Sequence, residues 1–427
     1  MKQNGISKID WKFTQVFGDK ASSEKVQEED IISAIQFDNT GKYLSLGDRA
    51  GRLIVFEMYQ HSKSKRVEYQ YLTELQSHTR EFDYLKSTDI EEKINQICWL
   101  NTQGKNMYCL TTNDKTIKLW KISERNIKKI VKSSSNKDYS MPKLQTVESG
   151  IMPTIRKVYP NLHTYHINQI STSQNEDFML SSDDLRVYLW SLEQPNKAFI
   201  AVDLKPDNLD ELSEVITSSQ FHPIQDNQFL YTTSKGIAKI GDMRQSGICD
   251  NTAITLSEKE DPSKKNFFTE IVASISDATF SKNGRYIFSR DFLNVKVWDV
   301  NMANKPVVTI PIFEPLKSKL CELYENECIF DKFSIQSSPC GNYFTTGNFN
   351  SSFHVIDRFG ENNLQFELNF NKKTMIKQIP QKYFENLGPN YEFSRKVLKS
   401  AYHPNQHIIA AASLNCLFFY SGSVQSQ

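Results

Sequence analysis

A strand–turn–strand pattern recurs seven times along the 427 residues and constrains the fold more than any other feature of the chain. In the clearest copy, residues 280–300 (FSKNGRYIFSRDFLNVKVWDV), Asn283 and Gly284 predict a tight turn before a short apolar strand. A second strand follows Asp291 and ends in a Trp-Asp pair at Trp298. Such a unit is typical of the inner part of a propeller blade.

The seven copies are spaced too widely for a minimal blade. Aligned on the end of their second strand, they fall 51 to 70 residues apart, at Phe56, Trp120, Trp190, Gly241, Trp298, Ile356 and Tyr420. A blade needs about 40–45 residues, so the excess is expected in loops, where binding residues usually lie. Unrelated strands of a β-sandwich are the alternative, but seven copies in one order disfavour it. The sequence therefore predicts an all-β, seven-bladed β-propeller of the WD-repeat type.

The whole chain, residues 1–427, is expected to form this one propeller. Residues 9–16 predict a strand that closes the ring against the last repeat. Residues 124–163 are the longest insertion and are expected to project as an arm, while residues 360–396 form a polar insertion before the last blade. A short surface helix is expected over residues 203–215, with Leu212 on its exposed face.

Composition excludes several classes of protein. Lys and Arg number 51 against 50 Asp and Glu, so a net charge of +1 gives no overall attraction to nucleic acid or membrane, and neither is expected as a partner. No apolar run approaches the roughly 18 residues of a spanning helix, and the N-terminus lacks a signal-peptide core. Seven scattered cysteines favour free thiols in a reducing compartment, the cytoplasm or the nucleus.

The chain carries no motif of an enzyme or a metal site. Phosphate-binding glycine loops, HExxH, CxxC and GxSxG patterns are all missing from the sequence, so no cofactor, metal or catalytic residue is predicted. His222-Pro223 and His403-Pro404 occupy equivalent places in two repeats, which favours a role in turns over catalysis. His163 and His166 stand where a strand begins, and either a structural hydrogen bond or a surface contact would explain them.

Acidic residues gather between the repeats. Four clusters fall in inter-blade segments or inner turns: Glu24/Glu28/Glu29/Asp30, Asp89/Glu91/Glu92, Asp183/Asp184 and Asp207/Asp210/Glu211/Glu214. If these segments share one face, they form an acidic rim that would attract a basic peptide. The alternative is that surface loops are commonly acidic without a partner.

The chain resembles the B-type regulatory subunits of protein phosphatase 2A, in the same order over nearly its whole length. The segments FDYLKS, NDKTIKLWKISER and LYENECIFDKF are not propeller consensus and are similar to family signatures. The resemblance implies a propeller that binds a helical-repeat scaffold subunit and, through it, a catalytic Ser/Thr phosphatase subunit that holds the metals. It implies a substrate-recruiting regulatory role and no chemistry in this chain.

The resemblance also implies a site for phosphoprotein substrates with basic segments, in an acidic groove on the top face. The matching positions are Glu28, Arg49, Glu91, Glu92, Lys93, Tyr165, His166, Asp184, Leu212, Glu325 and Phe330. Asp184 and Leu212 would together hold a basic residue and an apolar neighbour of one motif, although packing of a small helix would also explain Leu212. Arg49 stands where the family commonly has Lys, which keeps the charge and changes its geometry.

The family grips its scaffold with a hairpin arm, and here Arg125, Lys128 and Lys129 are the matching candidates. The residues after ISER look shorter than in the family and diverge from it. A peptide-binding adaptor of another complex, of the chromatin or ubiquitin-ligase type, is the alternative function. An enzyme built on a propeller is a third, and no group of residues supports it.

Overall fold

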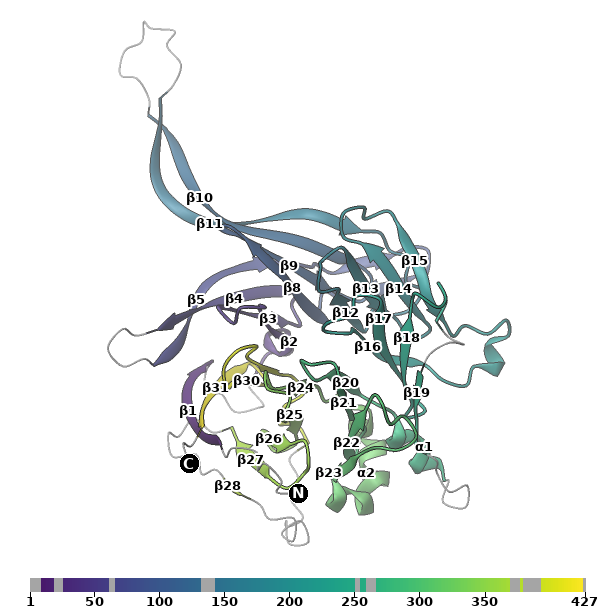
Figure 1. Cartoon of the computed structure of the whole chain (residues 1–427). Coiled ribbons are helices and arrows are strands. Elements are labelled where there is room, and N and C mark those ends of the chain that lie inside the picture. The colour runs from purple at the N-terminus through teal and green to yellow at the C-terminus, as the bar shows by residue number, and fades with distance from the viewer. Residues whose placement is uncertain are drawn as a thin grey trace, which may run out of the picture.

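The structure, a computed structural model, describes residues 9–18, 26–60, 66–131, 143–249, 254–258, 266–368, 377–378 and 393–424. Seven antiparallel sheets of four or five strands surround one axis, and in Figure 1 the ring is seen close to end-on. Each inner strand contacts the inner strands of both neighbouring blades, so the ring is continuous. The predicted seven-bladed propeller is therefore confirmed.

The blades follow one another along the chain, each from its inner to its outer strand. Blades 1 to 3 comprise β2 (Ile32–Phe37), β3 (Tyr43–Asp48), β4 (Arg52–Gln60) and β5 (Val67–Gln76); β8 (Gln96–Gln103), β9 (Asn106–Thr112), β10 (Ile117–Val131) and β11 (Lys143–Tyr159); and β12 (Gln169–Thr172), β13 (Phe178–Ser182), β14 (Arg186–Ser191) and β15 (Ala198–Asp203). Blades 4 and 5 comprise β16 (Ile216–Phe221), β17 (Gln228–Thr233), β18 (Ala238–Asp242) and β19 (Ile254–Leu256); and β20 (Asp277–Phe280), β21 (Tyr286–Arg290), β22 (Asn294–Asp299) and β23 (Val308–Pro311).

Blades 6 and 7 complete the ring. Blade 6 comprises β24 (Ile335–Ser337), β25 (Tyr343–Asn348), β26 (Ser352–Asp357), β27 (Asn363–Glu367) and β28 (Lys377–Gln378), and blade 7 comprises β29 (Ser400–Tyr402), β30 (Ile408–Ser413), β31 (Cys416–Val424) and β1 (Ile9–Phe17). Strand β1 pairs antiparallel with β31 from Ile9↔Val424 to Phe17↔Leu417, so the predicted closing strand is confirmed. The repeat seen in the sequence covers the second and third strands of each blade, and the innermost strand precedes it.

Short elements lie in the connections between blades. They are the 3-10 helices η2 (Glu28–Asp30), η3 (Leu209–Glu211), η5 (Glu314–Lys319) and η6 (Cys328–Phe330), the helices α1 (Phe267–Ala273) and α2 (Leu320–Glu325), and a separate hairpin of β6 (Glu81–Asp83) and β7 (Thr88–Ile90). The helix expected over residues 203–215 is only the single turn η3, where the Asn208 side chain accepts the N–H of Asp210. The Asn208 side chain caps this turn, the backbone becomes extended at Leu212, and residues 213–215 lead to β16 without regular secondary structure.

Apolar side chains fill the space between successive blades. One cluster, for example, joins Leu53 and Val55 of blade 1 to Trp99 and Trp120 of blade 2. Buried indole N–H groups need acceptors, and Trp120, Trp190 and Trp298 each donate to a hydroxyl nine residues earlier on the neighbouring strand, at Thr111, Ser181 and Ser289. The repeated Trp thus contributes both packing and a satisfied polar contact between strands.

The predicted arm region, residues 124–163, contains a long hairpin. Strands β10 and β11 pair with each other along their whole length, whereas β10 pairs with β9 only as far as Ser123↔Asn106. Residues 124–131 and 143–151 therefore extend beyond the blade as a two-stranded ribbon, which leaves the ring in Figure 1. Residues 152–159 return as the outer strand of blade 2, and 160–163 lead toward blade 3.

The region predicted as a polar insertion, residues 360–396, has two distinct parts. Asn363–Glu367 forms β27, the fourth strand of blade 6, and buries Phe366 against Phe353. Lys377 and Gln378 add a short fifth strand. Residues 369–376 and 379–392 lie outside the described part of the chain.

The paired His-Pro turns have the structural role that the sequence indicates. His403 Nδ1 accepts the N–H groups of Asn405 and Gln406, and His222 Nδ1 accepts those of Ile224 and Gln225. Each ring also lies over a glycine of the next blade, Gly41 and Gly284, where an added Cβ would come within 2.2 Å of a ring atom. Burial lowers the pKa of His403 to about 4, because a charged ring would lose its solvation and its acceptor role.

Acid is expected to destabilise the fold partly through His403. The pKa of His403 in the folded state lies below the unfolded value near 6.5. The contribution of neutral His403 to the free energy of unfolding is therefore complete above pH 6.5 and is lost as the pH falls toward 4. That loss is at most about 3 kcal/mol. Replacement by a non-titrating acceptor, His403→Asn, should flatten the dependence of unfolding free energy on pH in this window. Denaturant titrations from pH 7 to 4 measure it, with His166→Asn at an exposed site as the control. Parallel curves for the wild type and His403→Asn would contradict the assignment.

Candidate functional site

All eleven predicted substrate-contacting residues lie on one face of the ring. In an antiparallel four-stranded blade, the turn between the second and third strands opens on the same side as the connection from the outer strand to the next blade. Arg49 and Asp184 occupy such turns, and the other nine occupy such connections. We call this side the upper face. The arm continues the turn between the third and fourth strands of blade 2, so it leaves from the lower face.

The acidic clusters lie on the upper face as well, but ion pairs offset part of their charge. Arg49 pairs with Glu28, and Arg52 pairs with Asp30 at 2.5 Å. Asp89 pairs with Arg80, and Glu214 pairs with Lys239 at 3.2 Å. Several carboxylates remain exposed on this face: Glu29, Glu91, Asp207, Asp210 and Glu211. Glu24 lies outside the described residues.

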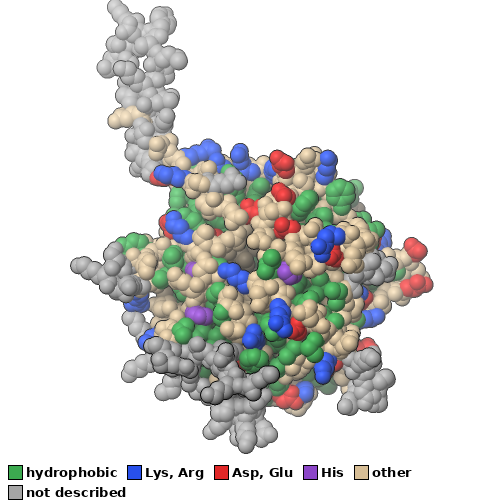
Figure 2. All heavy atoms as spheres, in the orientation of Figure 1, with side chains coloured by type: hydrophobic (Ala, Val, Ile, Leu, Met, Phe, Trp, Pro, Cys, Tyr) green, Lys and Arg blue, Asp and Glu red, His purple; other side chains and the backbone are tan. Residues whose placement is uncertain are grey.

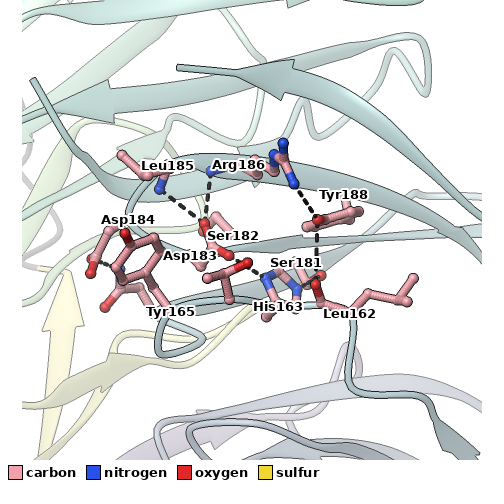
Figure 3. Close-up of polar contacts among 12 residues, drawn as sticks. Leu162, His163, Tyr165, Ser181, Ser182, Asp183, Asp184, Leu185, Arg186 and Tyr188 are labelled. Carbon is pink, nitrogen blue, oxygen red and sulfur yellow. Dashed lines mark hydrogen bonds and ion pairs between the residues drawn. The ribbon is translucent and has the colours of Figure 1, made fainter. Parts of the chain in front are cut away.

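One turn is held by a buried polar network, shown in Figure 3. His163 Nδ1 lies 3.0 Å from Asp183 Oδ2, and His163 Nε2 lies 2.6 Å from Ser181 Oγ, which also accepts the indole N–H of Trp190. Asp183 Oδ1 accepts the backbone N–H groups of Leu185 and Arg186. Burial disfavours the ionised form of Asp183 and would raise the pKa of its carboxyl. The hydrogen bond with His163 and, after it, those from the backbone N–H groups outweigh this effect and keep that pKa below its usual value.

This network has the order of a catalytic Ser-His-Asp triad, yet it is structural. Ser181, His163 and Asp183 are at most 3% exposed, and Ser181 Oγ is occupied by Trp190. The structural explanation of His163 is therefore confirmed, while His166 is exposed and pairs with Asp114 at 2.9 Å. The buried carboxylate fixes the turn and directs its neighbour Asp184 to the upper face.

Asp184 is linked through side chains to the connection that carries Phe330. Asn168 donates to Asp184 Oδ1 at 2.8 Å and accepts from Lys332 Nζ at 3.2 Å. Asp184 and Phe330 also line the same pocket of about 900 Å³, and Ser213, next to Leu212, lines it too. The structure thus brings together Asp184 of blade 3, Ser213 of the connection into blade 4 and Phe330 of the connection that leaves blade 5, around a pocket lined mostly by blades 4 and 5 and the segment between them.

Aromatic side chains border this pocket. Phe267 and Phe330 line it and are 62% and 57% exposed. Tyr324 packs edge-on or tilted against both, with ring centroids 5.6 and 5.9 Å away. Below them, Ile275, Phe292 and Ile329 are each at most 4% exposed and form an apolar floor. Such a pocket suits an apolar side chain of a bound segment.

Charges of both signs line the pocket: Asp184, Glu258, Glu270, Asp331, Lys235, Lys296 and Lys332. Lys296 pairs with Glu258 at 3.0 Å, and Asp331 pairs with Lys396 from outside the pocket. Lys332 donates to the amide oxygen of Asn168, so its positive charge stays near Asp184. Asp184 and Glu270 are the pocket carboxylates that would meet an incoming cation. The pocket is mixed in charge, with its acidic side toward blades 3 and 5.

Sequence reasoning missed helix α1, which supplies Phe267, Glu270 and Ile271 to the pocket. A signal was present in Asn266 and Thr269. The Asn266 side chain accepts the N–H of Thr269, and the Thr269 hydroxyl lies 2.8 Å from the Asn266 N–H, which is a capping box.

The remaining predicted residues lie apart from the pocket around the upper face. Glu28 and Arg49 pair over blade 1, while Tyr165 and His166 lead into blade 3. Glu91, Glu92 and Lys93 lead into blade 2, where the Glu91 carbonyl accepts from Asn113 at 3.0 Å. Glu325 ends α2 beside the aromatic rim. Figure 2 shows one end of the ring, on which acidic, basic and apolar side chains are interspersed.

The candidate scaffold-binding residues all lie on strand β10 of the ribbon. Arg125 is exposed and pairs in register with Gly150. Lys128 and Lys129 lie farther out, opposite Thr146 and Gln145. Among the described residues, no three or more His, Cys, Asp or Glu side chains are grouped to hold a metal ion, and none of the helices there combines the length and hydrophobicity that a membrane span requires.

Known proteins similar to the chain match it over nearly its whole length. It is 42% identical over 454 aligned residues to a B-type regulatory subunit of protein phosphatase PP2A from Schizosaccharomyces pombe, covering 96% of this chain and 97% of that protein. It is 40% identical to a phosphatase 2A regulatory subunit of Dictyostelium discoideum, with 97% and 99% covered. It is 44% identical to the beta isoform of the 55 kDa B-type regulatory subunit of phosphatase 2A from Carassius auratus, with 93% and 95% covered. No protein-family model matches the chain.

Removal of His163 should destabilise the fold, whereas removal of Asp184 should not. His163→Ala leaves the buried Asp183 carboxyl without its side-chain partner, and a buried acceptor left unsatisfied typically costs about 1–3 kcal/mol, or more when it is charged. Asp184→Ala removes one half-buried hydrogen bond, for which about 1 kcal/mol or less is expected. Chemical denaturation of both variants beside the wild type measures the difference. Equal losses would show that the network does not hold the turn.

Proposed function

The chain belongs to the family of B-type regulatory subunits of protein phosphatase 2A, and from this premise we propose that it recruits substrates to the phosphatase through its upper face. The family, the propeller fold and the regulatory, non-catalytic role predicted from the sequence are confirmed by the relatives and the blades. The proposed partners are a scaffold subunit, a catalytic Ser/Thr phosphatase subunit and phosphoproteins with basic segments.

The pocket over blades 3 to 5 is the observation that carries the proposal. It places a carboxylate, Asp184, beside an apolar floor and an exposed aromatic rim that includes Phe330. A short segment would place an apolar side chain against the rim and a basic side chain at Asp184. The network around His163 holds Asp184 before binding, so little ordering entropy is lost there when a substrate arrives.

The exposed acids of the upper face add a longer-range contribution. Glu91 lies in the connection into blade 2, and Asp210 and Glu211 lie in the connection into blade 4, which also supplies Ser213 to the pocket. They would raise the local concentration of basic segments and speed association, with an effect that falls as salt rises. The arm contributes on the opposite face, where Arg125, Lys128 and Lys129 would contact the scaffold. Substrate and scaffold would therefore bind without competing for one surface.

The seven cysteines support a reducing compartment. None of them forms a disulfide; four are buried, one is half-buried, and the two exposed ones are Cys321 and Cys340. We propose a cytoplasmic or nuclear location on this basis.

Charge reversal in the pocket should weaken substrate recruitment without disrupting assembly. In a holoenzyme reconstituted from scaffold, catalytic subunit and this chain, Asp184→Lys should lower kcat/KM for a basic phosphoprotein by about 30-fold or more, as expected when a buried charge pair worth about 2 kcal/mol or more is lost. Hydrolysis of a small phosphate ester should stay the same, because it needs no recruitment.

Glu361→Lys is the matched control, since Glu361 is exposed in a turn on the lower face of blade 6. Phe330→Ala should lower kcat/KM for the same phosphoprotein through loss of the aromatic rim. If Asp184→Lys and Glu361→Lys reduce phosphoprotein turnover equally, the pocket is not the recruitment site. If the wild-type chain fails to bind the other two subunits, the holoenzyme role itself is wrong.

A further inference from the structure

Three lysines meet on the upper face where the axis of the ring emerges. Each stands just before the innermost strand of its blade: Lys93 precedes β8, Lys332 precedes β24, and Lys399 is the residue before β29. The innermost strands surround the axis (Figure 1), so the residues that lead into them approach one another although they belong to blades 2, 6 and 7. We call Lys93, Lys332 and Lys399 the axial lysines.

Hydrogen bonds between the connections show how close these segments are. Lys332 Nζ donates to the side-chain oxygen of Asn168 at 3.2 Å, and Asn168 directly precedes β12 of blade 3. Blades 3 and 6 stand nearly opposite each other in a ring of seven, so this hydrogen bond crosses the axis. The Ser334 N–H donates to the Leu398 carbonyl at 2.9 Å, which places Lys399 beside the segment that carries Lys332.

The positive charges of the axial lysines are not neutralised by ion pairs. Among the described residues, neither Lys93 nor Lys399 has a hydrogen-bond or ion-pair partner. Both carboxylate oxygens of nearby Asp277 instead accept backbone N–H groups of blades 5 and 6. Burial lowers the pKa of the Lys399 ammonium group, Asp277 partly offsets this effect, and the charges of Lys93 and Lys332 lower that pKa further. Binding of an anion would relieve this repulsion between like charges.

The number of ammonium groups indicates the kind of anion. A phosphate monoester carries nearly two negative charges at neutral pH and has three acceptor oxygens, so it can accept from three lysines at once. A carboxylate has one charge and two oxygens. The exposed acids elsewhere on the upper face, such as Glu91 and Asp210, would repel an extended polyanion. A single phosphate group is therefore the ligand that the arrangement favours.

The axial lysines lie next to the pocket proposed for recruitment. Asn168, which accepts from Lys332, donates to Asp184 Oδ1 at 2.8 Å, and both Lys332 and Asp184 line that pocket. A substrate segment with a basic side chain at Asp184 would therefore bring a phosphorylated residue a few positions away to the axis. Phosphorylation near a basic segment would then strengthen its recruitment.

We infer that Lys93, Lys332 and Lys399 bind a phosphate group where the axis emerges on the upper face. The inference rests on the proposed function and extends it, because it gives a recruited phosphoprotein a second phosphorylated residue that is held and not hydrolysed. Inorganic phosphate, the product of a phosphatase reaction, has the same chemistry and would compete for the site.

The test uses the full-length chain and pairs of fluorescent peptides that differ only in one phosphate. Both peptides of a pair carry an arginine and a leucine, for Asp184 and the aromatic rim, followed by a serine that is phosphorylated in one of them. Several pairs vary the spacing between the leucine and the serine. At the best spacing, fluorescence anisotropy should show about tenfold tighter binding of the phosphopeptide to the wild type. Lys399→Gln should reduce this preference to about twofold or less.

A second variant and a control separate loss of the phosphate contact from loss of the fold. Lys93→Gln should reduce the preference in the same way, and the melting temperature of each variant shows whether it is folded. Lys305→Gln removes an exposed lysine from a lower-face turn of blade 5 and should leave both affinities unchanged.

Inorganic phosphate distinguishes the two sources of the ligand. It is titrated into the complex of the wild type with the phosphopeptide. Removal of the preference only at millimolar phosphate would support a phosphorylated side chain as the ligand. Removal at micromolar phosphate would support the site and identify free phosphate as its ligand.

Two results would overturn the inference and leave the proposed function standing. One is equal binding of both peptides to the wild type at every spacing. The other is a preference for the phosphopeptide that persists in folded Lys399→Gln and Lys93→Gln, because the phosphate would then lie elsewhere. If neither peptide binds the wild type, recruitment through the pocket is itself wrong, and the inference fails with it.

Discussion

The ring depends on the pairing of its two chain ends. Blade 7 takes three strands from the C-terminal part of the chain and its fourth, β1, from the N-terminal part. Trp11 on β1 is 2% exposed and packs edge-on against Phe366 and Tyr402, so closure buries a large aromatic side chain as well as a row of backbone hydrogen bonds. Gln15 then exchanges two hydrogen bonds with the backbone of Tyr69, which ties the closed blade to blade 1. A propeller without this pairing would expose two sheet edges.

The closed ring divides the molecule into two faces with different tasks. Strand direction alone sends the connections between blades to the upper face and the arm to the lower one. Within the propeller, the buried network of His163, Asp183 and Ser181 holds the turn of blade 3 rigid and so supports Asp184. Helices α1 and α2 and the turn η6 then surround the pocket with aromatic rings from connections far apart in the chain. Rigid blades with variable connections allow such a site to be built without disturbing the core.

Much of the fold was accessible from the sequence because the repeat is local. In six of the seven copies, a turn, an apolar strand and a strand ending in Trp or another large residue lie within about 20 residues; the fourth copy ends at Gly241. The spacing of apolar side chains within such a short segment is enough to predict its strands and turns. The closing strand over residues 9–16 was accessible for the same reason. Helix α1 was missed, since its capping signal at Asn266 and Thr269 is short and stands in a polar segment. The helix over 203–215 was predicted too long, because the apolar spacing of Leu209, Leu212 and Val215 does not reveal that the chain turns extended after Glu211.

The sequence by itself determined the sevenfold repeat, the all-β propeller, the lack of enzyme motifs and, through its resemblance to a family, the residues expected at a substrate site. Only the tertiary structure decided which of those residues meet. Asp184, Ser213 and Phe330 are far apart in the chain and share a pocket because the ring places blades 3, 4 and 5 and their connections side by side. Likewise, ion pairs such as that between Arg49 and Glu28 show which acidic residues of the clusters have their charge neutralised by a basic partner. Such pairs depend on distances between side chains in different turns, which the local sequence pattern does not predict. Local spacing specifies strands and turns, whereas juxtaposition and charge balance depend on contacts between distant segments.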